Sequence, residues 1–354
     1  MGLIRLLLAI SVIMAHSSPI LGLTLVQGQL AVEIFFMISG FYMALILSEK
    51  YTKKSDYKLF ISNRFLKIFP TYWITLMICL IYQVIYLYLN PNSPNIFALF
   101  NPRFNLNPFT FITFLISNLI IFGQDVLLFF GLNTTTGALF FTSNFRLFKP
   151  ETFNFFFIAQ AWTLSLELTF YFLAPFLNRF KNKYLLLIMS LSFGLRLFIY
   201  SQGLNHDPWN YRFFPTELIF FLSGILMYRI YKYIQLKPFK KLSIYSFLFY
   251  ISFLIYYQYL PHERTKQLIL FLFSFIFIPF IFNLFKTNKI DRFIGELSFP
   301  VYICHFLIID ILTHFTNIPH QFLGITTITI SILFSIIILK SIINPINLFR
   351  QSRI

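Results

Sequence analysis

The chain of 354 residues is 58% hydrophobic, 21% aromatic and only 11% charged, and it contains 51 phenylalanines. A soluble core of this size does not need so much apolar surface, so the composition excludes an ordinary soluble protein and indicates a membrane protein. The formal net charge of +16 does not indicate nucleic-acid binding, because the basic residues are confined to short junctions between apolar runs. That distribution carries information about membrane topology instead.

Ten apolar runs are each about as long as a segment that crosses a bilayer. They cover residues 3–22, 30–47, 65–89, 162–178, 184–201, 213–230, 243–260, 265–285, 294–315 and 322–343. The first run has some features of a secretory signal, but the polar His16 interrupts it and many more spans follow. We therefore expect an uncleaved first span.

The positions of lysine and arginine decide whether an eleventh apolar run, residues 109–130, also crosses. If it does not, and the N-terminus is cytoplasmic, 21 of the 28 basic residues lie inside, six lie outside and Arg196 lies within a span. If it does cross, this asymmetry collapses, so the positive-inside rule favours ten spans with both termini in the cytoplasm. Residues 90–161 then form one long outer segment, in which 109–130 is re-entrant or interfacial.

The sequence thus predicts an all-α, polytopic integral membrane protein in which residues 1–354 form a single membrane-embedded domain. No soluble domain, nucleotide-binding loop or glycine-rich phosphate cradle is recognisable. Cys79 and Cys304 lie inside apolar runs without a metal-like spacing, so neither a disulfide framework nor a metal site is expected. We expect the protein to act within the membrane or at its faces.

Two ionisable residues share one face of the first span. Arg5 and His16 are eleven residues apart, which in a helix places them within roughly 20° of the same direction and roughly 16 Å apart. Ionisable groups inside a membrane are costly and often mark functional sites. The alternative is that Arg5 reaches the lipid headgroups and His16 hydrogen-bonds a neighbouring helix.

Further ionisable residues fall at a similar depth in the outer half of the predicted spans. The set is His16, Glu33, Glu167, Arg196, Glu217 and His305. Together they predict a polar cavity, in which a histidine beside carboxylates can act as a general base and an arginine can stabilise an oxyanion. For any one of them, the alternative is a buried polar pair that joins two helices.

Five local patterns follow one another along the chain. They are Arg5 with His16, EIFFMISGF (33–41), RFLKIFP (64–70), WTLSLELTFY (162–171) and GELSFPVYICH (295–305). In order and spacing they resemble the acyltransferase family 3 membrane O-acyltransferases over essentially the whole chain. The chain departs from the family pattern at two positions. Gly2 stands where an aspartate is usual, three residues before the arginine, and Lys67 stands where an arginine is usual.

The resemblance implies a fold of about ten helices and a bacterial protein of the cytoplasmic (inner) membrane. It implies transfer of an acyl group, usually acetyl, from a cytoplasmic thioester to a hydroxyl of a cell-surface or lipid-linked glycan. It also implies a catalytic role for His16 and a donor-handling role for Arg64 and Lys67.

These roles predict a reaction scheme. The phosphates of acyl-coenzyme A, a substrate and not a permanently bound cofactor, contact Arg5, Arg64 and Lys67. His16 deprotonates the acceptor hydroxyl or carries the acyl group itself, Glu33 or Glu167 orients the imidazole, and Trp162 stacks on a sugar ring. The predicted substrate-binding set also includes Arg196, Ser298, Tyr302 and His305. The expected partners are acyl-coenzyme A, a glycan or lipid-linked sugar, and membrane lipids.

A glycan or lipid transporter is the rival interpretation, because it too places charges within the membrane and needs no soluble domain. One similarity favours it: Glu33 stands six residues before Ser39-Gly40, and Glu217 stands six residues before Ser223-Gly224. An internal repeat and chance both account for this similarity at the level of sequence. A sensor or scaffold protein has no specific feature in its favour.

Overall fold

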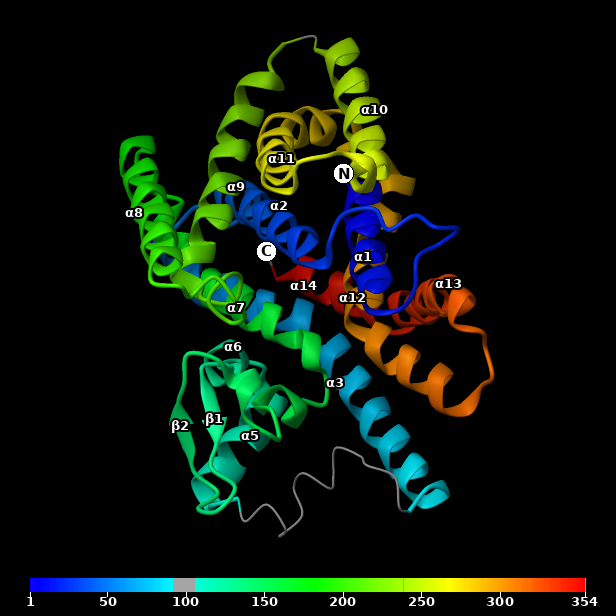
Figure 1. Ribbon diagram of the computed structural model, residues 1–354. Helices are drawn as coiled ribbons and strands as arrows, with labels where there is room; N and C mark the ends of the chain where they lie inside the picture. Colours follow the sequence, from blue (N-terminus) through cyan, green and yellow to red (C-terminus); the bar gives the residue numbers. More distant parts are fainter. Residues whose placement is uncertain (92–105, 238, 354) are drawn as a thin grey trace.

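The structure is a computed structural model that describes residues 1–91, 106–237 and 239–353, and 77% of it is helical. The helices are α1 Gly2–His16, α2 Gly28–Glu49, α3 Tyr57–Leu89, α5 Pro108–Ile120, α6 Gln124–Leu127, α7 Trp162–Leu177, α8 Asn182–Ser201, α9 Phe214–Ile234, α10 Lys240–Tyr256, α11 Glu263–Phe285, α12 Lys289–Phe315, α13 His320–Ile338 and α14 Asn344–Ser352 (Figure 1). Strands β1 Phe130–Leu132 and β2 Leu139–Phe141 form a small antiparallel sheet.

Each of the ten apolar runs coincides with a helix, which confirms a helical protein of the multi-pass kind. Among the described residues, six helices are long and apolar enough to cross a membrane: α2, α3 with the turn before it, α8, α11, α12, and α13 with its extension to Ser352. The number of ten spans stays a prediction, because α1, α7 and α10 have only 15, 16 and 17 residues. Helix α9, with 21 residues, is also not among the six. Large apolar side chains such as Leu187, Leu191 and Phe198 are exposed along α8, as expected for a face that contacts lipid.

The first helix is shorter than predicted, because it ends at His16 instead of continuing to residue 22. Pro19 follows closely, and the residue before a proline is disfavoured in helical geometry. Fifteen residues span about 22 Å, which is less than the roughly 30 Å of a hydrocarbon core. His16 is therefore the last residue of α1, and it is exposed.

The uncertain run 109–130 is not one continuous helix. Its helix α5 has 13 residues, or about 20 Å, which is too short to cross a bilayer. The turn after it is anchored to α7, because Gly123 N–H donates to Ser165 Oγ (2.8 Å) and Ser165 Oγ donates to Asp125 (2.5 Å). The β-hairpin that follows was not predicted. Residues 92–105 of the outer segment, including Arg103 of the charge count, lie outside the described residues.

Hydrogen bonds divide the connecting segments into two sets. In one set Thr24 bonds to Gln258, Gln27 to Glu263 and Arg146 to Asp207; in the other Arg229 bonds to Asn182 and Arg353 to Asn63. In every case the two partners belong to segments that the charge count places on the same side of the membrane. Which face is cytoplasmic stays a prediction from that count.

Helices α2 and α9 approach each other closely through two glycines. A Cβ on Gly40 would lie 2.0 Å from the carbonyl oxygen of Phe221, and a Cβ on Gly224 would lie 2.1 Å from that of Met37. Phe36 stacks on Phe221 beside this crossing, with ring centroids 4.6 Å apart. The Ser39-Gly40 and Ser223-Gly224 elements of the two similar segments therefore meet at one helix crossing.

A single added methyl group tests this packing. We expect Gly40→Ala to lower the stability of the folded protein by about 1–3 kcal/mol, because the new Cβ overlaps backbone that cannot move freely. Gly194→Ala, on the lipid-exposed helix α8, is the matched control, since a Cβ there meets no atom within 4 Å. Thermal unfolding of the purified variants in detergent measures the difference. Equal melting temperatures for Gly40→Ala and the wild type would contradict the close α2–α9 crossing.

Candidate functional site

A cavity of about 680 Å³ lies among α1, α2, α3, α7, α12 and α14. It brings together a subset of the predicted site residues: Arg5, Arg64, Lys67, Glu167, Ser298 and Tyr302. His16, Glu33, Trp162, Arg196 and His305 do not line it. The ionisable residues predicted to share one cavity therefore lie in separate groups.

The cavity carries an excess of positive charge. Seven of its lining side chains are basic and four are acidic. Arg64 is only 6% exposed, and its Nε has no hydrogen-bond partner. In the described part of the chain, no carboxylate lies within ion-pair distance of Arg5, Arg64 or Lys67, although Glu167 is near enough to Lys67 and Arg5 to interact with their charges. Such an imbalance favours an anionic ligand.

The start of α1, which carries Arg5, is held by a residue that sequence reasoning missed. The Asp291 carboxylate on α12 accepts hydrogen bonds from the backbone N–H groups of Gly2 (2.7 Å) and Leu3 (3.0 Å). A carboxylate at a helix N-terminus is favourable because it faces the positive end of the helix dipole. A Cβ at position 2 would lie 1.7 Å from the Asp291 carbonyl oxygen. The departure from the family at Gly2 thus has a steric reason, and Asp291 supplies a carboxylate from another helix.

Two histidines meet beside Tyr302, which lines the cavity. The rings of His16 and His305 stack with centroids 5.6 Å apart, and Phe306 lies 4.5 Å from His16. His305 is fully buried, and its Nδ1 lies 2.5 Å from the carbonyl oxygen of Tyr302. A carbonyl only accepts, so Nδ1 carries the proton in the neutral ring, and Nε2, which has no partner, is left as an acceptor.

Tyr302 joins the cavity to the histidine pair. Its side chain lines the cavity, its hydroxyl pairs with Thr163 Oγ1 (2.9 Å), and its carbonyl oxygen is the partner of His305. Gln160 fixes this region further, because its amide donates to the carbonyl oxygen of Ile303 (2.6 Å). The late sequence pattern predicted Tyr302 and His305. Thr163 lies in the pattern 162–171 but was not singled out, and Gln160 lies outside the five patterns.

Trp162 is not free to stack on a sugar in the predicted way. It is buried, and the guanidinium of Arg212 lies 4.2 Å from its ring centroid. Tyr211 packs edge-on against the same indole at 5.2 Å. Arg212 therefore occupies one face of the ring on which a sugar was expected.

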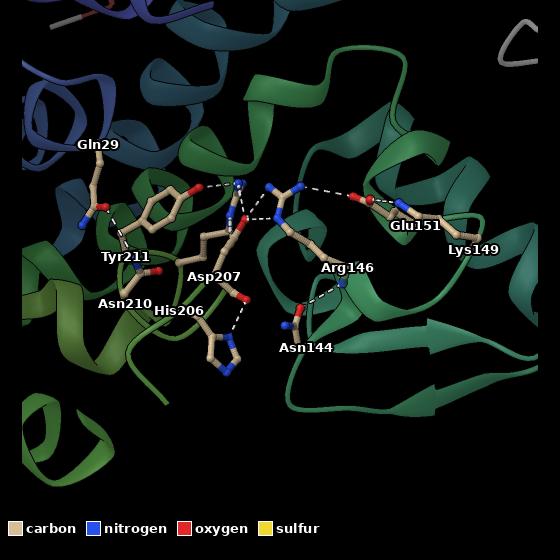
Figure 2. Close-up of polar contacts among 10 residues, drawn as sticks. Gln29, Asn144, Arg146, Lys149, Glu151, His206, Asp207, Asn210 and Tyr211 are labelled. Atoms are coloured by element: carbon tan, nitrogen blue, oxygen red, sulfur yellow. Dashed lines mark hydrogen bonds and ion pairs between the residues drawn. The ribbon is translucent and has the colours of Figure 1, made fainter. Parts of the chain in front are cut away.

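A network of charges beyond Trp162 ties the loop between α8 and α9 to the outer segment (Figure 2). The Asp207 carboxylate forms ion pairs with Arg146 Nη2 at 2.6 Å and with Arg212 Nε at 2.5 Å. Glu151 pairs with Arg146 at 3.1 Å and also with Lys149. Burial alone would lower the pKa of Arg146, but its hydrogen bond and ion pair with Asp207 raise that pKa above its ordinary value. Sequence reasoning treated these basic residues only as topology signals.

Glu33, Arg196 and Glu217 form a separate buried ion triad. Arg196 Nη2 lies 2.7 Å from Glu33 and 3.0 Å from Glu217, and both glutamates are almost completely buried. The same nitrogen donates to the carbonyl oxygen of Asn210 (2.5 Å). The described hydrogen bonds of Glu33 thus point to Arg196 and Gln29, not to the imidazole of His16 that it was expected to orient.

The triad predicts a strong dependence of stability on Arg196. Arg196→Ala leaves two carboxylates buried side by side, and we expect a loss of about 3–5 kcal/mol in the free energy of unfolding. The triple variant Glu33→Gln, Arg196→Met, Glu217→Gln removes all three charges and should recover much of that loss. Denaturation in detergent measures both. A triple variant no more stable than Arg196→Ala would contradict the electrostatic origin of the effect.

Comparison with known proteins gives one family match and two relatives. The family described as "Acyltransferase domain" matches residues 1–343. An uncharacterised protein of Aquifex aeolicus (strain VF5) is 28% identical over 195 residues, which cover 52% of this chain and 81% of that protein. A protein of Acidianus two-tailed virus named "Putative acetyltransferase ORF330" is 32% identical over 178 residues, which cover 46% of this chain and 51% of that protein. No solved structure matches the chain.

Proposed function

The chain belongs to the acyltransferase family 3, and on this premise we propose that it moves an acyl group, acetyl by preference, from acyl-coenzyme A to a hydroxyl of a cell-surface or lipid-linked glycan. The observation that carries the proposal is the cavity itself, whose basic side chains outnumber its acidic ones and share one space with Tyr302, the residue that holds His305. We place the protein in the bacterial inner membrane, with both termini in the cytoplasm.

The donor fits the charge and size of the cavity. Acyl-coenzyme A is anionic through its phosphates, and Arg5, Arg64 and Lys67 offer charge-assisted contacts that neutral side chains cannot. A volume of about 680 Å³ lies in the range of small-molecule and cofactor sites. The pantetheine arm follows apolar lining residues such as Phe35 and Leu164 toward Tyr302, which brings the thioester close to the histidines.

The histidine pair supplies the proton transfer. In direct transfer, His16 takes the proton of the acceptor hydroxyl as that oxygen bonds to the thioester carbonyl carbon. The carbon–sulfur bond then breaks, and the imidazolium returns the proton to the departing thiolate of coenzyme A. Transfer through an acyl-histidine satisfies the same balance in two steps. His305, which stacks on His16, positions that ring.

The family match favours a transferase over the transporter interpretation. The similar Glu33 and Glu217 segments meet where α2 and α9 cross, and Gly40 and Gly224 allow close approach there. Both glutamates form ion pairs with Arg196.

The proposed function predicts a mass change in surface glycan. Cells that carry the protein should contain glycan heavier by one acyl increment than cells that lack it. His16→Ala should remove that increment, because loss of a general base typically costs about 10²–10⁴ in rate. His320→Ala, an exposed histidine at the start of α13, is the matched control. Mass spectrometry of extracted glycan gives the readout, and normal acylation by His16→Ala would exclude its catalytic role.

The donor site predicts a selective kinetic defect. Arg64→Glu combined with Lys67→Glu should raise the KM for acyl-coenzyme A about tenfold or more, because two charge-assisted contacts are lost. The KM for the acceptor should change little. Steady-state assays with each substrate varied in turn measure the two constants, and an unchanged donor KM would remove both residues from the donor site.

A further inference from the structure

The last helix, α14, contributes to the cavity although it lies beyond the family match. The match ends at residue 343 and α14 begins at Asn344, directly after a π-helical turn, Leu339–Ile343. Figure 1 shows α14 near the centre of the molecule, and Asn347, Arg350 and Gln351 line the cavity. The cavity wall is therefore completed by a segment that lies beyond the family match.

Hydrogen bonds from Arg353, the residue after α14, hold this helix against α3; we call this set of bonds the clasp. Arg353 donates to Asn63 Oδ1 (3.0 Å) and to Ser62 Oγ (2.9 Å), and Asn63 in turn donates to the Tyr51 hydroxyl (2.8 Å). Asn63 directly precedes Arg64 in α3. The clasp thus brings α14 to the same turn of α3 that carries the predicted donor-binding arginine.

Arg350 and Arg64 both have unused donors. Arg350 Nη1 donates to Asn347 Oδ1 (2.7 Å), but its Nε is buried without a partner, and so is Nε of Arg64. The two side chains line the same cavity, and Lys67 lines it with them. Arg353, by contrast, has hydrogen-bond acceptors for its guanidinium. Cations that share a cavity and keep buried, unpaired N–H groups are stabilised when an anion with several acceptor oxygens lies between them.

We propose that Arg350 of α14 and Arg64 of α3 together bind a phosphate group of the acyl donor. This inference rests on the proposed function, since the donor class comes from there. A guanidinium presents a planar fork of N–H donors that matches phosphate oxygens, whereas a lysine offers only a point charge. Lys67 lacks this fork, so Arg350 supplies the second fork of the site from beyond the family match.

Binding measurements on the purified, full-length protein test the assignment. Titration calorimetry in detergent compares coenzyme A and inorganic pyrophosphate as probes. Arg350→Ala should weaken the binding of both probes about tenfold, because a charge-assisted contact is lost. Arg350→Lys, which keeps the charge but not the fork, should fall between Arg350→Ala and the wild type. Arg179→Ala is the control, since Arg179 is an exposed residue that does not line the cavity.

The outcomes separate this inference from the proposed function. Wild-type affinity for coenzyme A in folded Arg350→Ala would overturn the role of Arg350 while the donor assignment stands. Binding of pyrophosphate that depends on Arg350, without binding of coenzyme A, would support the phosphate site and overturn the proposed donor. If Arg350→Ala does not fold, wild-type affinity in Arg350→Lys overturns the need for the fork.

Discussion

The packing of α1 along α12 fixes both ends of the candidate site. At one end Gly2 and Gly295 lack Cβ atoms, so the two backbones approach until the first N–H groups of α1 reach Asp291. At the other end His16 stacks on His305. A shift of α1 by one turn, about 5.4 Å, would break both contacts and carry Arg5 away from its place in the cavity.

Charge compensation separates the ionisable groups that join helices from those whose charge faces the cavity. Arg196 has two carboxylates and a carbonyl oxygen as partners. Its positive charge is therefore compensated within the protein and is not available to an anionic ligand. Arg64 and Lys67 lie in a cavity with an excess of basic side chains, and Arg64 keeps an unpaired N–H. Residues of one chemical type, all within a membrane protein, therefore divide into two roles according to their neighbours.

The positions of the helices were predictable from the sequence because each one is an apolar run bounded by polar junctions. Helix α1 ends at His16 because Pro19 follows closely. The apolar run continues past Pro19 to residue 22, so its length predicted a longer helix. The grouping of the polar residues was not predictable. Depth within a span says nothing about which helices are neighbours, so Glu33 was assigned to the histidine although it pairs with Arg196, 163 residues away.

Other parts of the site had no signal in the sequence. Asp291 holds the start of α1 by hydrogen bonds to its backbone, and it does so from α12, across 289 residues. Arg212 was counted as an outer charge, and only the fold shows it against Trp162. Motifs predicted Tyr302 and His305 because these residues lie close together on one helix, where spacing alone determines their geometry.

The position of bound coenzyme A tests the central claim most directly. A cryo-electron microscopy structure of the full-length protein with coenzyme A would locate its sulfur atom relative to the helices. Our account predicts the phosphates at Arg64 and Lys67 and the sulfur beside Tyr302, next to the His16–His305 pair. Coenzyme A bound outside this cavity, or bound in it with the sulfur directed away from Tyr302, would contradict the account.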